Sequence, residues 1–340
     1  MPGSVTSVFS EPEDFEAALR EEGCLDLLIT GRGQFRAQLT QIALHRLRLS
    51  AAEEQLSRIA FITVPADMIL MAFPIGGGTA PIWCGVRMRA GEMMTVGPGQ
   101  RLHTRTDGLC HWGAIRLPVE EFVRYGRALT GAPIAVPSVA RCWRPPSAGR
   151  DLRKFHGAAI RMAHTQPKLL VDAEAARGLE QQLIHAVIEC CLSGSAERGI
   201  SSGSAERGIS SAHRHRDIMG GFEDLLQSQR QRHLRVAEIC VLLGVSDRTL
   251  RSLCAEHLGQ SPSSYLRLRR AQRVHRALRS GNPDAATVAE VARRYGVRHL
   301  GRFAANYRAL YGELPSATLR RGADGGMTEL KLGRQRVKFP

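Results

Sequence analysis

Two segments in the last third of the chain repeat one plan, in which a glycine ends a short helix and arginines project from the next one. The first segment has Gly244 followed by Arg248 and Arg251, and the second, about 52 residues later, has Gly296 followed by Arg298. A guanidinium group can make two hydrogen bonds to the edge of guanine, and a short exposed helix fits the major groove of DNA. The pattern therefore predicts two helix-turn-helix units whose second helices contact DNA.

Apolar residues on one side of each of these second helices define which residues face outward. Leu250, Leu253 and Leu258 share one face in the first unit, and Leu300 and Phe303 lie at similar positions in the second. Because an α-helix has 3.6 residues per turn, the residues between them lie on the opposite face. We predict that these outward residues, with the serine that caps the first of the two helices, contact DNA. They are Ser246, Arg248, Thr249, Arg251, Ser252, Arg298, His299, Arg302, Ala305 and Asn306.

Arginines on an isolated helix more often form a solvated surface. Contact with DNA is favoured here because the arginines belong to a helix-turn-helix pattern that occurs twice. For Arg298, Arg302 and Asn306 a second interpretation stays open, in which they bind phosphates without reading bases. Ser246 is also placed to cap the helix that follows it, because a serine side chain can accept a hydrogen bond from a free N–H group at a helix start.

The elements that must position these residues are short amphipathic helices joined by Gly, Asn-Pro or Ser. The periodicity predicts helices at about 217–230, 235–243, 247–258, 262–280, 286–295, 299–311 and 315–321. The fourth of these has residues spaced by four on one face and lies between the two units. It would act as a rigid spacer that holds the two DNA-contacting helices about one duplex turn, roughly 34 Å, apart.

Three motifs occur in order over about 90 residues: Gly-Val-Ser-x-Arg-x-Leu at 244–250, Gly-Gln-Ser-Pro-Ser-Ser-Tyr-Leu at 259–266, and Arg-Phe-x-x-x-Tyr-Arg-x-x-Tyr-Gly-x-x-Pro-Ser at 302–316. With these motifs, the segment from about 229 to 321 resembles the DNA-binding domain of the AraC/XylS family of bacterial transcription regulators. Cys240, Val297 and the run 298–301 depart from the family pattern. The resemblance implies a sequence-specific regulator, an activator of transcription that contacts RNA polymerase.

The distribution of charge also indicates a polyanionic partner for the C-terminal part. The chain has a net charge of +15, and residues 211–340 alone carry 24 Lys and Arg against 11 Asp and Glu, a net charge of +13. Double-stranded DNA is favoured over a membrane, because no apolar amphipathic stripe accompanies the positive charge. A nonspecific architectural DNA-binding protein remains an alternative, since charge alone does not give sequence preference.

An exact duplication marks the expected domain boundary. The sequence SGSAERGIS occurs at 193–201 and again at 202–210. A flexible Gly/Ser-rich segment tolerates such lengthening, whereas a packed element would lose its register. We therefore expect a sensory domain at 1–192, a flexible linker at 193–211, a DNA-binding domain at 212–321 and a disordered tail at 322–340.

The region from about 30 to 118 is predicted to be β-rich, with strands at 43–49, 58–64, 68–73 and 93–96 and turns at glycine clusters. Helices are expected at about 119–130 and 150–192, the second with an apolar face that packs on the β region or on a second copy of the chain. The predicted fold class is multidomain α+β, with a small antiparallel N-terminal barrel or sandwich and an all-α C-terminal domain.

The runs 83–94, 98–99 and 115–118 resemble, more weakly, the cupin-like β-barrel sensory domain of one branch of the same family. This resemblance implies a small-molecule effector in the N-terminal domain and a homodimer, whose recognition helices would bind direct repeats in a promoter. We name four effector-binding candidates, although the tryptophans and the methionine are more often ordinary core residues. They are Trp83, Met93, His103 and Trp112.

Other chemistries are less favoured. His103 and His111 flank a loop that could hold a metal in a cupin barrel, but the nearest acid is Asp107 and there is no His-x-His pair, so we expect no metal and no cofactor. The Gly76–Gly78 run is not followed by Lys-Ser/Thr, as a phosphate-binding loop requires, and we expect no enzymatic activity. A cupin-type enzyme fused to a DNA-binding module stays as an alternative that metal analysis would test.

The cysteines and the N-terminus indicate the compartment. Eight cysteines occur without a Cys-x-x-Cys pair, which favours buried free thiols, with a redox sensor at Cys190 and Cys191 as the minor alternative. The chain has no apolar run of about 18 residues and the first 20 residues do not form a signal peptide. We therefore expect a cytoplasmic protein with no membrane partner.

Overall fold

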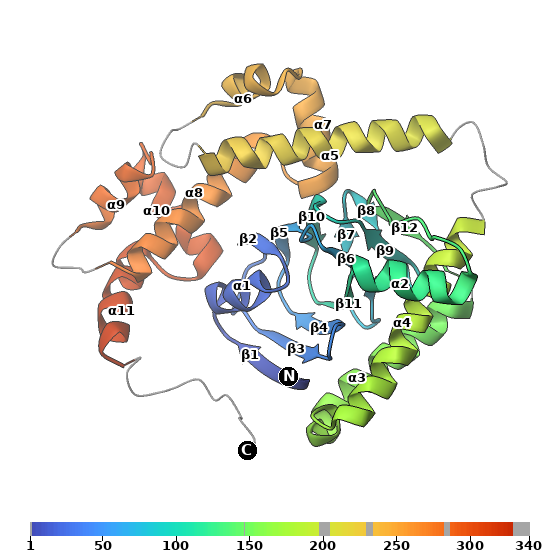
Figure 1. The fold of residues 1–340 in the computed structure, drawn as a ribbon. Helices are drawn as coiled ribbons and strands as arrows, with labels where there is room; N and C mark the ends of the chain where they lie inside the picture. The colour runs from blue at the N-terminus through green and yellow to red at the C-terminus, as the bar shows by residue number, and fades with distance from the viewer. Residues whose placement is uncertain (1, 146, 197–204, 229–233, 282–285, 329–340) are drawn as a thin grey trace.

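The computed structural model describes residues 2–145, 147–196, 205–228, 234–281 and 286–328. The strands all lie in the N-terminal half, which we call the β domain (Figure 1). They are β1 (Gly3–Phe9), β2 (Cys24–Ile29), β3 (Ala37–Ala43), β4 (Arg48–Glu54), β5 (Arg58–Thr63), β6 (Met68–Pro74), β7 (Ile82–Trp83), β8 (Val86–Arg87), β9 (Met93–Val96), β10 (Arg101–Thr106), β11 (Cys110–Pro118) and β12 (Arg141–Trp143).

Helices flank the β domain, and helices are the only regular elements described after residue 204, in the part that we call the helical domain. In the β domain they are α1 (Pro12–Arg20), α2 (Val119–Thr130), α3 (Ser147–Thr165), the short 3-10 helix Pro167–Leu170, and α4 (Ala173–Ala196). In the helical domain they are α5 (Ala205–Ser228), α6 (Val236–Leu243), α7 (Asp247–Leu258), α8 (Pro262–Arg279), α9 (Val288–Arg294), α10 (Leu300–Tyr311) and α11 (Pro315–Thr328).

The strands form two antiparallel sheets around a shared core. One sheet has the order β1-β3-β4-β11-β6-β9-β12, and the other has the order β2-β5-β10-β7-β8. Leu27 and Leu102 from the smaller sheet pack with Leu39 and Ala72 from the larger one, all at most 2% exposed. The prediction of an antiparallel, sheet-rich N-terminal domain is confirmed.

Helices α2, α3 and α4 cover the other face of the larger sheet. Leu183, Val187 and Cys190 of α4 are buried in one cluster with Met71 and Ile115 of that sheet. The apolar face that was predicted for the second helical stretch therefore packs on the β domain in this structure.

The start of the β domain differs from the sequence prediction in two respects. The strand that was predicted at 43–49 is wrong, because these residues form the turn between β3 and β4 and its two edges. Leu44 and Leu47 are buried although they lie at this turn, and their hydrophobicity produced the false strand. Conversely, β1, α1 and β2 all lie before residue 30, where no element was predicted.

The duplicated segment has helix at both described ends. Residues 193–196 are the end of α4 and residues 205–211 belong to α5, while 197–204 lie outside the described residues. In the same way α11 continues to Thr328, beyond the expected helix end at 321, and 329–340 lie outside the described residues. The boundaries of the expected linker and tail stay predictions.

The first part of the helical domain shares its core with the β domain. Phe222, Leu253 and Tyr265 from α5, α7 and α8 form one buried cluster with Leu28 and Ile59, which lie on the outer face of the smaller sheet. A separate cluster, which includes Val274, Leu278 and Tyr307, holds α9, α10 and α11 against the end of α8. None of the described helices combines the length and hydropathy needed to span a lipid bilayer.

Candidate nucleic-acid interface

The first predicted unit forms a helix, a tight turn and a second helix. Helix α6 ends at Gly244, whose φ of 64° is in the left-handed region that glycine adopts without steric penalty. Ser246 then caps α7, because its side-chain oxygen accepts a hydrogen bond of 3.0 Å from the N–H of Thr249. Leu250 and Leu253 are at most 1% exposed. The predicted turn and cap are both present.

The outer face of α7 carries the predicted candidates of the first unit. Arg248 and Ser252 are exposed, and the hydroxyl of Thr249 lies 2.8 Å from Ser246 Oγ. Arg251 is also exposed, but its Nε donates a hydrogen bond of 2.5 Å to the carboxylate of Asp247. The Arg248 side chain can therefore bind a ligand directly, whereas Arg251 must first share or break its ion pair with Asp247.

The second unit also forms a helix, a turn and a second helix, and a buried tyrosine holds its second helix in place. Gly296 has a φ of 77°, and α10 begins directly after His299. Tyr307 of α10 is fully buried, and its hydroxyl lies 2.6 Å from His275 Nδ1 of α8 and donates a hydrogen bond of 2.8 Å to Thr318 of α11. These contacts fix α10, so that the predicted residues at 298, 299, 302, 305 and 306 are all exposed.

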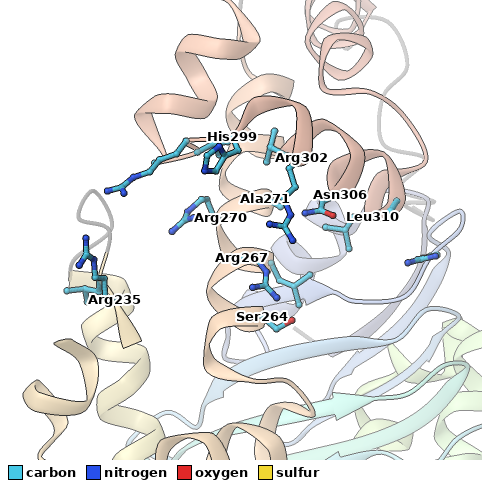
Figure 2. Close-up of a pocket in the computed structure, with 17 residues that line it drawn as sticks. Arg235, Ser264, Arg267, Arg270, Ala271, His299, Arg302, Asn306 and Leu310 are labelled. Carbon is cyan, nitrogen blue, oxygen red and sulfur yellow. The ribbon is translucent and has the colours of Figure 1, made fainter. Parts of the chain in front are cut away.

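A groove of about 720 Å³ lies between α8 and α10 and collects four of the predicted residues of the second unit, Arg298, His299, Arg302 and Asn306. Ala305 does not line it, and neither do the candidates of the first unit. Figure 2 shows Arg267 and Arg270 on α8, with Arg302 and Asn306 on the neighbouring helix, around this space. We call it the arginine groove, after six arginines that line it. They are Arg32, Arg235, Arg267, Arg270, Arg298 and Arg302.

The arginine groove carries uncompensated positive charge. No Asp or Glu is among the described residues that line it. Within the described residues, no ion pair joins any of its six arginines to a carboxylate. Burial, together with the nearby charges of Arg298 and Arg267, lowers the pKa of Arg270. Guanidinium groups gathered in this way attract an anion, and phosphate is the anion whose geometry they match.

The sequence prediction missed the groove residues outside the two units. Arg267 and Arg270 are three residues apart on the predicted spacer helix, and this helical spacing was a signal that could have identified them as neighbours of α10. Arg235 precedes the first unit, and Arg32 belongs to the β domain. Nothing local to Arg32 in the sequence indicates that it lies beside residues more than 200 positions away.

The opposite side of α8 is bound to the β domain through a buried ionic network. Glu223 of α5 is fully buried, accepts a hydrogen bond of 2.6 Å from the hydroxyl of Tyr265 and pairs with Arg269. Its carboxylate also lies 2.9 Å from His103 Nε2 of β10. Arg269 makes a second ion pair, of 2.7 Å, with Asp26 of β2. Despite complete burial, the positive charge of Arg269 and the hydrogen bond from His103 lower the pKa of Glu223 to about 2.

Further ion pairs continue along α8. Arg276 pairs with the buried Glu16 of α1. The Arg279 guanidinium lies 2.5 Å from the carboxylate of Glu11 and 2.9 Å from that of Glu13. The arginines on this side of α8 are therefore neutralised by carboxylates of the β domain or of α5. Helix α8 thus has one side whose arginines are paired and one side, in the arginine groove, whose arginines are not.

The four effector-binding candidates lie in three different surroundings. Trp83 and Trp112 belong to the core between the two sheets, where the Trp112 indole N–H donates to Glu54. Met93 belongs to the core between the larger sheet and α3 and α4. His103 contacts Glu223 at the boundary with the helical domain. Their proposed role stays a prediction, and the structure does not bring the four together around one space.

The residues considered for metal binding or redox chemistry have other partners. His111 Nδ1 is 2.8 Å from the carbonyl of Gly76, and Asp107 pairs with Arg87 at 2.7 Å. Among the described residues, no three His, Cys, Asp or Glu side chains are grouped as metal ligands. None of the eight cysteines is part of a disulfide. Burial raises the pKa of Cys190 to about 12, which leaves little reactive thiolate at neutral pH.

Comparison with known proteins identifies the C-terminal part. A family model described as "Helix-turn-helix domain" matches residues 239–321. The XylDLEGF operon transcriptional activator of Pseudomonas putida is 36% identical over 95 residues, which are 28% of this chain and 30% of that protein. The probable thc operon regulatory protein of Rhodococcus erythropolis is 36% identical over 97 residues, 28% of this chain and 29% of that protein. The chain therefore matches less than a third of the length of these relatives.

Among solved structures, the AraC-like transcriptional activator CuxR aligns with 81% of this chain and 96% of its own, at 17% identity and a TM-score of 0.41. ToxT from Vibrio cholerae aligns with 94% of this chain and 97% of its own, at 11% identity and a TM-score of 0.29. The assignment of this domain rests on the sequence matches, and the family model spans the chain from within α6 to within α11.

Proposed function

From the AraC-type helix-turn-helix domain that residues 239–321 form, we propose that this protein is a sequence-specific DNA-binding regulator of transcription. The observation that carries the proposal is the pair of exposed helices α7 and α10, each held by a buried inner face and each presenting arginine outward. Both helices are joined through the single helix α8. A duplex that meets one of them in its major groove is then within reach of the other.

Readout would be divided between the two units. Arg248 on α7 has no carboxylate partner among the described residues and is suited to a bidentate contact with a base. Arg298 and Arg302 lie in the arginine groove, where a phosphate contact is as well supported as a base contact.

A homodimer would present four such helices to direct repeats in a promoter. Activation would proceed through contact with RNA polymerase in the cytoplasm.

Control by a small-molecule effector in the β domain completes the proposal. Its support is the extent of the contact between the domains, in which Glu223, Arg269, Arg276 and Arg279 connect α5 and α8 to the β domain. An effector that favours one packing of the β domain would shift the population of DNA-competent arrangements of the helical domain. We propose no enzymatic role, since the matched relatives are regulators of operons.

The test is selection of genomic DNA fragments with the purified full chain, followed by anisotropy titration of the enriched fragment and of scrambled DNA at physiological salt. A regulator is expected to prefer its site by roughly 10³-fold or more. Equal affinity for both DNAs would leave only a basic polyanion binder and would refute the proposal. Stoichiometric iron or manganese in the purified protein would instead support an enzyme fused to a DNA-binding module.

Variants separate base contacts from phosphate contacts. Arg248→Ala is expected to weaken binding to the selected site by about 1–3 kcal/mol and to relax selectivity at one base pair. Arg302→Ala, if it removes a phosphate contact, should weaken binding to all sequences alike. Arg320→Ala is the matched control, because Arg320 is exposed on α11 and does not line the arginine groove. If both test variants behave like this control, neither arginine contacts DNA.

A further inference from the structure

One arginine of the arginine groove comes from the β domain. Arg32 is exposed in the loop between β2 and β3, and it lines the groove together with Arg267 and Arg270 of α8. We propose that the groove binds the sugar-phosphate backbone of DNA between the two base-reading helices, and that Arg32 makes the β domain a direct DNA contact. The proposal rests on the proposed function, because it assumes that α7 and α10 bind one duplex.

The charge of the groove is the first argument. Its lining in the described part of the chain has six arginines and no carboxylate, and Ser264 and Asn306 add uncharged hydrogen-bonding groups. Each guanidinium presents a planar set of donors that matches phosphate oxygens. The crowding of like charges around Arg270, which with burial lowers its pKa, would be relieved by an anion in this space. The groove is therefore built for phosphate rather than for an uncharged ligand.

The contrast between the two sides of α8 is the second argument. Arg269, Arg276 and Arg279 are all paired with carboxylates of the β domain or of α5. Arg267 and Arg270 are on the same helix but have no carboxylate partner among the described residues. Acidic residues thus neutralise the side of α8 that packs within the protein and leave the other side positive. Arg267 and Arg270 are therefore available to bind an anionic partner outside the chain.

The extent of the groove favours DNA over a small phosphorylated molecule. Its lining runs from Arg235, directly before α6, to Arg302 and Asn306 on α10, so that it reaches from the first unit to the second. A DNA strand supplies one phosphate for every base pair, at a rise of about 3.4 Å, and can meet several arginines in succession. A small anion would neutralise only part of this charge.

Arg32 reaches the groove because the β domain is fixed against α8. Asp26 of β2 lies shortly before the loop and pairs with Arg269, and Gln272 of α8 donates to the carbonyl of Leu27 in the same strand. These contacts place the end of β2 beside the groove. The DNA contact of Arg32 therefore depends on the packing of the β domain, which is the feature that an effector would change.

The test compares Arg32→Ala with Arg36→Ala in the full chain. Arg36 is the matched control, because it is exposed in the same loop and does not line the groove. Anisotropy titrations with the selected site and with scrambled DNA are made at several salt concentrations. Arg32→Ala is expected to lower the affinity for both DNAs equally, by roughly three- to tenfold. It should also reduce the slope of log affinity against log salt concentration by about 1. Arg36→Ala should match the wild type.

Three outcomes would overturn the inference. If Arg32→Ala binds both DNAs with the affinity and salt slope of Arg36→Ala, the β domain makes no DNA contact. If the same holds for the double variant Arg267→Ala, Arg270→Ala, the groove binds no backbone. If Arg32→Ala weakens binding of inorganic pyrophosphate, measured by calorimetry, but leaves DNA affinity unchanged, the groove is a site for a small phosphorylated ligand. Failure of the proposed function is distinct, because the wild type would then show no preference for any site.

Discussion

Replacing Glu223 with glutamine tests whether the buried ionic network couples the two domains. Glu223→Gln keeps the shape of the side chain but removes its charge. In the native protein the carboxylate has three partners, Tyr265 and His103 on one oxygen and Arg269 on the other. Glutamine has one acceptor oxygen and an NH₂ group that only donates, so the bonds on one side of the carboxylate are lost and those on the other side become weaker. A hydrogen bond to a charged group contributes about 1.5–3 kcal/mol, so we expect a total loss of about 3 kcal/mol. Arg269 keeps its ion pair with Asp26, which prevents a larger loss.

The assay follows the two domains separately. All three tryptophans, Trp83, Trp112 and Trp143, belong to the β domain, so their fluorescence reports that domain. Far-ultraviolet circular dichroism is dominated by the helices, most of which lie in the helical domain. In urea titrations of the wild type we expect the two signals to change together. In Glu223→Gln the circular dichroism transition should move to a urea concentration about 1–2 M lower and separate from the fluorescence transition.

The control is Asp224→Asn at the next position of α5. Asp224 pairs with Arg101 of the β domain at 2.5 Å, but its side chain is 57% exposed, and a surface pair of this kind contributes about 0.2–1 kcal/mol. If Glu223→Gln shifts the transitions no more than Asp224→Asn does, the buried network does not hold the domains together and the reasoning is refuted. A double-mutant cycle with Arg269→Met would then assign the remaining coupling.

Three further predictions concern single residues. Burial lowers the pKa of His257 from 6.5 to about 4, so the free energy of unfolding is unaffected by protonation of this residue above pH 6.5 and falls by about 3 kcal/mol as the pH decreases to 4. His257→Phe should therefore make the free energy of unfolding, measured by urea titration across this range, less dependent on pH. An unchanged pH profile would contradict this. Ser246→Ala removes the cap of α7 and should lower the free energy of unfolding, measured by urea titration, by about 1 kcal/mol; a free energy equal to that of the wild type would contradict this. Cys190, whose pKa burial raises to about 12, should resist alkylation at neutral pH until the protein is unfolded, as mass spectrometry of the labelled peptides would show, and rapid labelling of native protein would revive a redox role.

The helical domain was largely predictable because its signals are local. A glycine that ends a helix, a serine that caps the next one and apolar residues at helical spacing all lie within one unit, and the predicted helix 247–258 has the bounds of α7. In the β domain the local signals are weaker. Leu44 and Leu47 looked like part of a strand because they are buried, although they occupy a turn.

Contacts between the domains could not be predicted from periodicity. Glu223 and His103 are 120 residues apart, and neither has a neighbour in sequence that marks it as buried at a boundary. The same applies to Arg32, which reaches the arginine groove only through tertiary packing. The predicted base-reading residues were found from one helix at a time, whereas the groove needs the spacer helix, both units and the β domain together. Their contacts with DNA stay predictions.

The shared core of α5, α7 and α8 with the smaller sheet has a practical consequence for anyone who shortens this protein. A fragment that starts within the duplicated segment would lose Leu28 and Ile59 from a buried cluster, and it would also lose the carboxylates of Glu16 and Asp26. It would expose an apolar surface beside newly unpaired arginines on α8. Such a fragment would aggregate and retain cellular nucleic acid during purification, and its DNA-binding curves would understate the selectivity of the full chain.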